Sequence, residues 1–400
     1  MTYQWQGPRV LDIKEVDMSE HNIKSDVNID GVITVSGTIS GASLLGDGSN
    51  ILNASPDASD YLQTTDTDIS IFGFADPDAD LTADSDILLP TQAAVKGYID
   101  KYYLSGTTRG FVAGGVTAIE TDTDSIETYP FSTNVLSTSH GTLSSERSGG
   151  SASSSETEGF IAGGQNLSGT PTLTAEISKT TFSTGGATAD HGDVITSRLY
   201  TSGNSGVAHG YVAGGIITST RQDIIEKFPY ATASSSADHG DLSETKYYGC
   251  NQEDGTYCYH SSGTTASVWT NVVERWLESS NTTATDLLDL SVAKTGQPAG
   301  LSTSQKGYTM GGSQSSSVAS NVCDYFVFAT TATAVDFGDL SVGRNQVSGS
   351  YGDYKGFMNG GFSGSLYYST LDSVSFASNS VAVSHGDLIT AKHSTMGLQG

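Results

Sequence analysis

Four histidines that recur at one position of a repeated pattern are the first residues that could do chemistry. They are His140, His191, His239 and His385, each followed directly by glycine. Imidazole is a common metal ligand, so such a set suggests a metal site. Ligands must lie about 2 Å from one metal, however, and equivalent positions of successive repeats lie too far apart for that. We therefore predict structural hydrogen-bonding histidines and no metal site.

Basic residues form a second periodic set of six, which suggests an anion site: Arg147, Arg198, Lys246, Lys294, Arg344 and Lys392. An aspartate stands five residues before five of them, at Asp193, Asp241, Asp289, Asp339 and Asp387, and Thr142 takes that place in the first repeat. This spacing favours a structural ion pair or a carbonyl cap within each repeat over an anion site.

Catalytic and cofactor-binding constellations are not recognisable. The acidic stretch DPDADLTADSD alternates aspartates like a calcium loop, but Ile87 stands where an EF-hand needs glutamate. The seven arginines and the poor Asp-box at Asp254 do not match a glycosidase of the sialidase type. Cys250, Cys258 and Cys323 are odd in number and lack metal-ligand spacing, which indicates buried thiols. We predict a protein without enzyme activity or cofactor.

Aromatic residues are the remaining candidates for binding, because flat rings stack on sugar faces. They gather in the fourth, irregular repeat: Tyr247, Tyr248, Tyr257, Tyr259, Trp269 and Trp276. One interpretation is that they fill a poorly matched repeat. The other is a receptor-binding site, for which we select Trp269, Tyr257 and Tyr259, with Trp269 the strongest because it lies in a loop of variable length.

The elements that position these residues follow from an apolar stretch that ends in two glycines. It reads GFVAGG, GFIAGG, GYVAGG, GYTMGG and GFMNGG, with a degenerate copy, CYHSSG, between the third and fourth. The final glycines are Gly115, Gly164, Gly215, Gly263, Gly312 and Gly361. Their spacing, near 50 residues, predicts four-stranded antiparallel blades. Alternating stretches that begin at Ile126, Ile177, Ile225, Val273, Cys323 and Leu371 predict a further strand in each blade.

Loop length and the C-terminus complete the prediction for residues 105–400. Apart from one extra residue between Lys294 and Gly312, length varies only between the double glycine and the next strand, which marks these loops as a binding face. The last residues, HSTMGLQG, match the segments that open other repeats, so they should pair into the blade at Gly110. Closure removes an open sheet edge. The fold class is therefore mainly β: a closed six-bladed β-propeller preceded by an extended, β-rich N-terminal stalk and one short helix.

The double glycine, the following aromatic strand and the basic residue resemble the kelch repeat, over almost three quarters of the chain. The resemblance implies a kelch-like propeller. The chain departs from the pattern because it lacks the tryptophan that many kelch repeats carry.

The first hundred residues carry no blade repeat. Residues 1–55 contain glycine-punctuated apolar alternation, too little for a core in one chain, which predicts attachment and trimerisation with identical chains. Residues 56–88 predict an acidic linker, and 89–104 a short helix with one apolar stripe, which suggests a bundle between chains. The segment LPTQAAVKGYID, residues 89–100, resembles one that recurs in bacteriophage tail fibres and related virion appendages.

Charge and hydropathy exclude some partners. The chain has 18 Lys+Arg against 44 Asp+Glu, a net charge of −26, which repels phosphate backbones. It has neither a run of 18 apolar residues nor a basic segment followed by an apolar stretch at its N-terminus. We expect a protein made in the host cytoplasm, with no nucleic-acid partner and no membrane insertion.

The tail-fibre resemblance implies a virion structural protein that forms a homotrimer through residues 1–104. Its propeller would bind a host surface polysaccharide or protein. The alternative is an architectural virion component, such as a fibre, baseplate or capsid decoration, whose propeller contacts other virion proteins. A free distal propeller face favours the first function, and a face buried in contacts favours the second.

Overall fold

The computed structural model describes residues 108–117, 121–168, 170–266, 268–315 and 318–400. These segments form strands, turns and loops without a helix, so none of them provides a long apolar helix that could cross a membrane. The predicted N-terminal region 1–55, acidic linker 56–88, helix 89–104 and trimer contacts lie outside the described residues.

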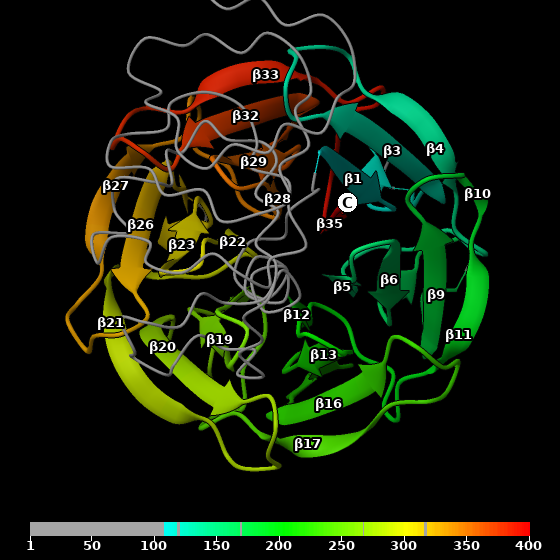
Figure 1. Cartoon of the computed structure of the whole chain (residues 1–400), viewed down its shortest axis with the longest axis horizontal. Coiled ribbons are helices and arrows are strands. Elements are labelled where there is room, and N and C mark those ends of the chain that lie inside the picture. The colour runs from blue at the N-terminus through cyan, green and yellow to red at the C-terminus, as the bar shows by residue number, and fades with distance from the viewer. Residues whose placement is uncertain (1–107, 118–120, 169, 267, 316–317) are drawn as a thin grey trace, which may run out of the picture. The chain divides into compact units, whose positions relative to one another are not determined.

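Six antiparallel four-stranded blades stand around a central axis, which confirms the predicted fold class (Figure 1). From the axis outward, blade one contains β35 (Met396–Gln399), β1 (Arg109–Ala113), β3 (Ser125–Pro130) and β4 (Thr138–Thr142). Blade two contains β5 (Ser151–Ser154), β6 (Glu158–Ala162), β9 (Glu176–Thr181) and β11 (Ala189–Asp193). Blade three contains β12 (Ser202–Ser205), β13 (His209–Ala213), β16 (Ile224–Pro229) and β17 (Ala237–Asp241).

The second half of the ring repeats this order. Blade four contains β18 (Cys250–Glu253), β19 (Tyr257–Ser261), β20 (Thr270–Leu277) and β21 (Thr285–Lys294). Blade five contains β22 (Ala299–Ser302), β23 (Lys306–Met310), β26 (Val322–Val327) and β27 (Val335–Asp339). Blade six contains β28 (Ser348–Tyr351), β29 (Lys355–Asn359), β32 (Thr370–Ser375) and β33 (Val383–Asp387).

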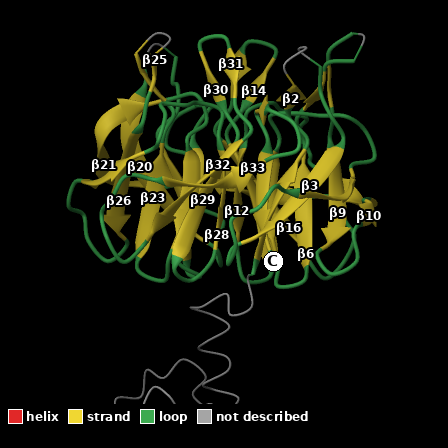
Figure 2. Cartoon of the chain, turned by 90° about the horizontal axis from the view of Figure 1, so that it is seen from above, coloured by secondary structure: helices red, strands yellow, loops and turns green. Residues whose placement is uncertain are grey.

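Short strand pairs rise from one face of the ring, and we call this face the crown (Figure 2). They are β2 (Val116–Thr117) with β34 (Lys392–His393), β7 (Gln165–Asn166) with β8 (Thr172–Leu173), β14 (Ile216–Ile217) with β15 (Thr220–Arg221), β24 (Ser313–Ser315) with β25 (Val318–Ala319), and β30 (Phe362–Ser363) with β31 (Leu366–Tyr367). In blade four a single bridge joins Thr264 to Trp269. The crown therefore consists of the loops whose length varies in the sequence.

The opposite face carries the C-terminus (Figure 2). There the amide of Thr108 donates to the carbonyl of Gly400 at 2.8 Å. The described chain thus enters and leaves the ring at one place, on the face that lies away from the crown.

Strand β35 closes the ring, as the C-terminal sequence predicted. It pairs antiparallel with β1, from Met396 opposite Ala113 to Gln399 opposite Gly110. One blade is thereby built from both ends of the propeller sequence, which removes the free edge of β1. A further short strand, β10 (Gly186–Ala187), pairs in parallel with the outer strand β4.

The final glycine of each repeated pair adopts a backbone conformation that other residues avoid. Their φ angles lie between 91° and 113° at Gly115, Gly164, Gly215, Gly263, Gly312 and Gly361. Space is also restricted, because a Cβ atom at Gly164 would lie 2.6 Å from the carbonyl oxygen of Ser148. The repeated glycines therefore shape the turn between the second strand of each blade and the crown.

The apolar core lies between neighbouring blades. In one cluster, Phe160 and Ile177 of blade two pack with Val212 and Phe228 of blade three. The aromatic residue of each second strand is at most 1% exposed, at Phe111, Phe160, Tyr211, Tyr259, Tyr308 and Phe357. Burial of these rings holds the blades face to face.

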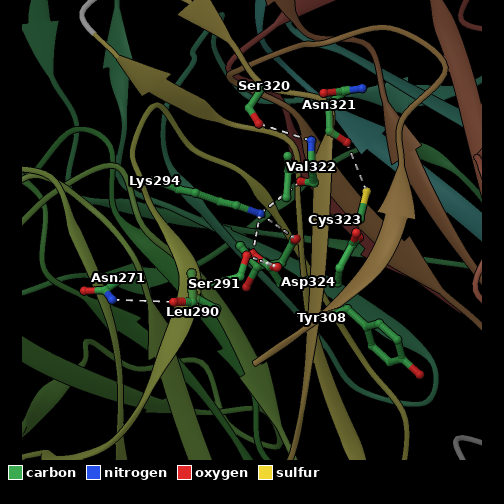
Figure 3. Close-up of polar contacts among 12 residues, drawn as sticks. Asn271, Leu290, Ser291, Lys294, Tyr308, Ser320, Asn321, Val322, Cys323 and Asp324 are labelled. Atoms are coloured by element: carbon green, nitrogen blue, oxygen red, sulfur yellow. Dashed lines mark hydrogen bonds and ion pairs between the residues drawn. The ribbon is translucent and has the colours of Figure 1, made fainter. Parts of the chain in front are cut away.

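An ion pair with a fully buried cation crosses every boundary between blades, and we call these six pairs the seam ion pairs. Each joins a periodic basic residue to an acidic residue of the third strand of the following blade. They are Arg147–Glu176 (3.3 Å), Arg198–Glu226 (2.6 Å), Lys246–Glu274, Lys294–Asp324 (2.8 Å), Arg344–Asp372 (2.7 Å) and Lys392–Glu127 (2.9 Å). Figure 3 shows one of them, with the Lys294 amine beside Asp324 and the carbonyl of Val322.

The prediction of structural ion pairs is thus confirmed, but the predicted partners are wrong. Asp193, Asp241, Asp289 and Asp387 are exposed and Asp339 is half-buried at the outer strands. The chain turns away after each of these aspartates and carries the basic side chain into the boundary with the next blade. A partner within the same repeat therefore remains in solvent while the true partner comes from the neighbouring repeat.

Hydrogen bonds complete the seam ion pairs. The second carboxylate oxygen of Glu226 accepts from the amide of Ile195 at 2.8 Å and from the hydroxyl of Ser236. Glu127 accepts from Ile389 at 2.7 Å in the same way. Such bonds offset the removal of both charges from water. Blade two differs, because Ser178 occupies the usual acidic position and Glu176 reaches in from the preceding surface position.

We expect that Glu226→Gln destabilises the propeller by about 3–5 kcal/mol, because it leaves the buried Arg198 without a counter-charge. Glu158→Gln is the matched control, since the Glu158–Lys179 pair is partly exposed, with side chains 25% and 30% exposed, and should contribute less than about 1 kcal/mol. Chemical denaturation of both variants measures the difference. Equal effects would contradict a structural role of the seam ion pairs.

We expect that removal of residues 393–400 abolishes cooperative unfolding, because blade one loses its inner strand β35 and exposes the edge of β1. Leu398→Ala provides a milder test, because Leu398 is 0% exposed and the change should lower the free energy of unfolding by about 2–5 kcal/mol. Thermal melts followed by circular dichroism report both effects. An unchanged melting midpoint in the truncated chain would refute closure through β35.

Candidate functional site

The four periodic histidines join neighbouring blades and do not converge on one point. Their Nε2 atoms lie within hydrogen-bonding distance of carbonyl oxygens at the end of the third strand in the next blade. The pairs are His140–Thr181 (3.1 Å), His191–Pro229 (2.8 Å), His239–Leu277 (3.0 Å) and His385–Pro130 (2.8 Å). The predicted structural role is therefore confirmed.

A β-bulge turns each histidine toward its neighbour. In blade three, Ile225 pairs with Gly240 and Glu226 with Asp238, so His239 is the extra residue. The glycine that follows leaves room for the next blade, because a Cβ atom at Gly240 would lie 2.4 Å from the carbonyl oxygen of Thr282. The His-Gly pair is thus a contact between blades. Blades four and five replace the histidine with half-buried Leu287 and buried Phe337.

Metal-binding groups are absent from the described part of the chain: it contains no cluster of three or more histidine, cysteine or acidic side chains placed to hold an ion. The three cysteines are buried and unpaired. Burial raises the pKa of Cys250 to about 11 and that of Cys323 to about 12, which keeps both thiols protonated. The acidic stretch that resembles a calcium loop lies outside the described residues.

The three predicted receptor-binding residues do not form one site. Tyr259 is 0% exposed and packs against Phe326 and Phe328, so its selection was wrong. Tyr257 begins β19, at the end away from the crown, where its ring lies 4.3 Å from the Arg275 guanidinium carbon. Trp269 alone belongs to the crown, where it is half-buried.

The six innermost strands surround a narrow axial cavity of about 100 Å³. Small residues allow these strands to pack backbone against backbone. A Cβ atom at Gly397 would lie 2.1 Å from the carbonyl oxygen of Gly349, and one at Gly300 equally close to that of Asn251. The cavity has room for a few water molecules only.

A closed ring of backbone hydrogen bonds surrounds the axis at the crown end of this cavity. Its members lie just after the periodic basic residues and have left-handed φ angles of 49° to 66°: Gly149, Tyr200, Tyr248, Gln297, Gln346 and Ser394. The bonds run from Gly149 N to Ser394 O (2.9 Å), Tyr200 N to Gly149 O (2.6 Å), Tyr248 N to Tyr200 O (3.2 Å), Gln297 N to Tyr248 O (3.0 Å), Gln346 N to Gly296 O (2.6 Å) and Ser394 N to Gln346 O (3.0 Å). Five non-glycine residues are thus held in a conformation that such residues rarely adopt.

Two tyrosines reach across the axis, one at each end of the cavity. At the crown end, the Tyr248 hydroxyl lies 3.5 Å from Nε2 of Gln346, two blades away. At the other end, the Tyr351 hydroxyl donates to Glu253, again two blades away. Burial raises the pKa of Glu253 to about 7. Each end of the axial cavity is thus crossed by a hydrogen bond between side chains of blades four and six.

Tyr200, Tyr247 and Tyr248 gather around the axis of the crown, and we call them the tyrosine platform. The ring centroid of Tyr248 lies 4.0 Å from that of Tyr200 and 4.6 Å from that of Tyr247. The Arg221 guanidinium carbon lies 5.4 Å from the centre of the Tyr247 ring. All four side chains are half-buried. Burial raises the pKa of Tyr200 and Tyr248, so both hydroxyls stay protonated.

Residue-type reasoning on the fourth repeat missed Tyr200, which precedes that repeat in the sequence. The available signal was its position: Tyr200 follows Arg198 as Tyr248 follows Lys246. This repeat position, two residues after the periodic basic residue, lies close to the axis. Its copies in successive repeats therefore approach each other, whereas equivalent positions on the outer strands are far apart.

No protein-family model matches the sequence, and a search of curated proteins finds no match. The candidate site therefore stands on its geometry: a platform of three tyrosines with one arginine, on the face away from the chain entry.

We expect His239→Leu to reduce the acid sensitivity of the fold. Burial lowers the pKa of His239 below its ordinary value of 6.5. The unfolded chain therefore binds a proton that the folded chain excludes, and stability present above pH 6.5 is lost as the pH falls through that value. Chemical denaturation at pH 7.5 and pH 5.5 should show a smaller loss in the variant. Phe337→His in blade five, as the reciprocal change, should enlarge the loss; equal losses in all three proteins would contradict the assignment.

Proposed function

We propose that this protein is a virion appendage of the tail-fibre type, and that its propeller binds a carbohydrate on the host surface through the crown. The N-terminal residues 1–104 would attach it to other virion proteins as a homotrimer. The resemblance of residues 89–100 to a tail-fibre segment supports the virion assignment. The tyrosine platform supports the binding assignment.

The strongest support is where the repeats diverge. The seam ion pairs, the final glycines and the blade strands recur around the ring. The crown residues that face the axis do not: Tyr200, Tyr248, Gln297 and Gln346 occupy one repeat position. A scaffold that repeats from blade to blade, with a loop face that varies, is the arrangement by which repeat proteins present binding sites.

Aromatic side chains suit a carbohydrate ligand. Sugars stack an apolar ring face on tyrosine while their hydroxyls bond to polar groups at the edge. The platform offers three rings beside the Gln346 amide and the Arg221 guanidinium. Strained, left-handed Tyr200 and Tyr248 are held by the backbone ring, so the platform is ordered before a ligand binds.

The architectural alternative has its own observation, an exposed apolar group at the rim between blades six and one. Leu136 is 59% exposed and Val383 is 63% exposed. Their segments are adjacent, since the Asn134 side chain donates to the carbonyl of Ser384 at 3.1 Å. Such a group fits a contact with another virion protein.

We expect full-length protein to bind bacterial cells and their extracted surface polysaccharides, measured by flow cytometry and biolayer interferometry. Tyr247→Ala with Trp269→Ala removes crown rings and should weaken binding about tenfold or more, as loss of aromatic anchors does. Leu136→Ser with Val383→Ser is the control at the rim and should leave binding unchanged.

Binding that depends on the rim pair and not on the crown pair would contradict the receptor function. Recruitment of the protein to particles through its propeller, with the same rim dependence, would establish the architectural role instead.

A further inference from the structure

Arg221 has no electrostatic counterpart in the described residues, which sets it apart from the three seam arginines. Arg147, Arg198 and Arg344 each pair with a carboxylate. No carboxylate of the described chain lies within ion-pair distance of Arg221. Its Nε lacks a hydrogen-bond partner, as do the Nε atoms of the three seam arginines, so the missing carboxylate is what distinguishes it. Arg275 also has no ion pair among the described residues, so what marks Arg221 as a candidate is its position beside the tyrosine platform. The guanidinium is partly open to water and pairs with no carboxylate of the described chain, so it is available to pair with an anionic group of a ligand.

The position of Arg221 directs that anion to the tyrosine platform. Arg221 ends β15 in the crown of blade three, and its guanidinium carbon lies 5.4 Å from the centre of the Tyr247 ring. Stacking against an aromatic ring holds a guanidinium plane in place while its edge stays available for hydrogen bonds. The side chain is half-exposed, so a ligand can reach it.

A carboxylate matches this arrangement. Guanidinium groups bind carboxylates through two parallel hydrogen bonds. A sugar acid carries its carboxylate on the ring carbon skeleton, so the same residue can stack on tyrosine and pair with arginine. A neutral sugar would leave the Arg221 charge unsatisfied.

We infer that the tyrosine platform and Arg221 form a binding site for a carboxylate-bearing sugar residue of an acidic surface polysaccharide. This inference rests on the proposed carbohydrate-binding function and names its ligand class. The protein's own negative charge repels acidic polymers in general, so recognition depends on this local site and not on long-range attraction. Added salt screens the long-range repulsion more than the direct contact between Arg221 and a bound carboxylate, because that contact is shorter than the screening length.

The experiment measures binding of full-length protein to a uronic-acid polysaccharide and to the same polymer after chemical reduction of its carboxyl groups. We expect the native polymer to bind at least about tenfold more tightly, as expected for a charged, two-point hydrogen bond. Arg221→Gln should remove this preference, so that the native and the reduced polymer bind the variant with similar affinity. Arg221→Lys should keep part of it, since lysine retains charge but not the fork of donors.

Arg275→Gln is the matched control. Arg275 also stacks on a tyrosine, 4.3 Å from the centre of the Tyr257 ring, but it lies outside the crown. The Arg275→Gln protein should bind both polymers as tightly as the unaltered protein does. Thermal melts verify folding, and Arg221→Gln should keep the melting midpoint because Arg221 forms no ion pair in the described chain.

The outcomes separate the two proposals. Equal binding of native and reduced polymers, with loss in the Tyr247→Ala and Trp269→Ala protein, overturns the acidic ligand and retains a carbohydrate-binding crown. A preference for the native polymer that survives Arg221→Gln also overturns the assignment of Arg221. Absence of crown-dependent binding to both polymers and to all cells tested overturns both proposals.

Discussion

The seam ion pairs are the interaction on which the rest of this propeller depends. Each blade supplies one cation to its boundary with the following blade and one carboxylate to its boundary with the preceding blade. No blade therefore neutralises its own buried charges. A side chain such as Arg344, 0% exposed, has its partner only when the neighbouring blade is in place. Unpaired buried charges are strongly unfavourable. The pairs therefore favour a complete ring over any arc of blades, and the Lys392–Glu127 pair joins the last blade to the first.

The histidine contacts and the double glycines act in support of the same boundaries. His239 extends from a bulge to the next blade, and Gly240 leaves room for the loop of that blade. These features lie in the outer strands and at the blade boundaries, and most of the residues that recur in every repeat take part in them. The ring of backbone hydrogen bonds around the axis is different, because its contacts are made by backbone atoms alone. Its side chains are consequently free to differ from blade to blade.

This division explains how much the sequence predicted. Blade number, strand positions, loop face and closure follow from a period of glycines and alternating residues, which report local backbone geometry. The partners of the ion pairs did not follow, because Asp193 and Glu226 are both plausible neighbours of Arg198 until the turn after β11 is known. Tyr259 was selected by residue type, yet strand alternation turns it into the core. Tyr200 was missed because proximity across the axis is a property of the closed ring and not of any single repeat.

The same reasoning supports the proposed binding site at the axis of the crown. The distance between equivalent residues of different blades increases with their distance from the propeller axis. On the outer strands, the four histidines each contact a different blade, whereas near the axis Tyr248 reaches Gln346 two blades away. Only near the axis can single side chains from several blades combine into one site. Tyrosines across both ends of the channel leave the crown surface as the place where that combination meets solvent. The ligand that we infer there combines a flat face for the platform with an anionic group for Arg221, which stacks on Tyr247 and has no ion-pair partner among the described residues.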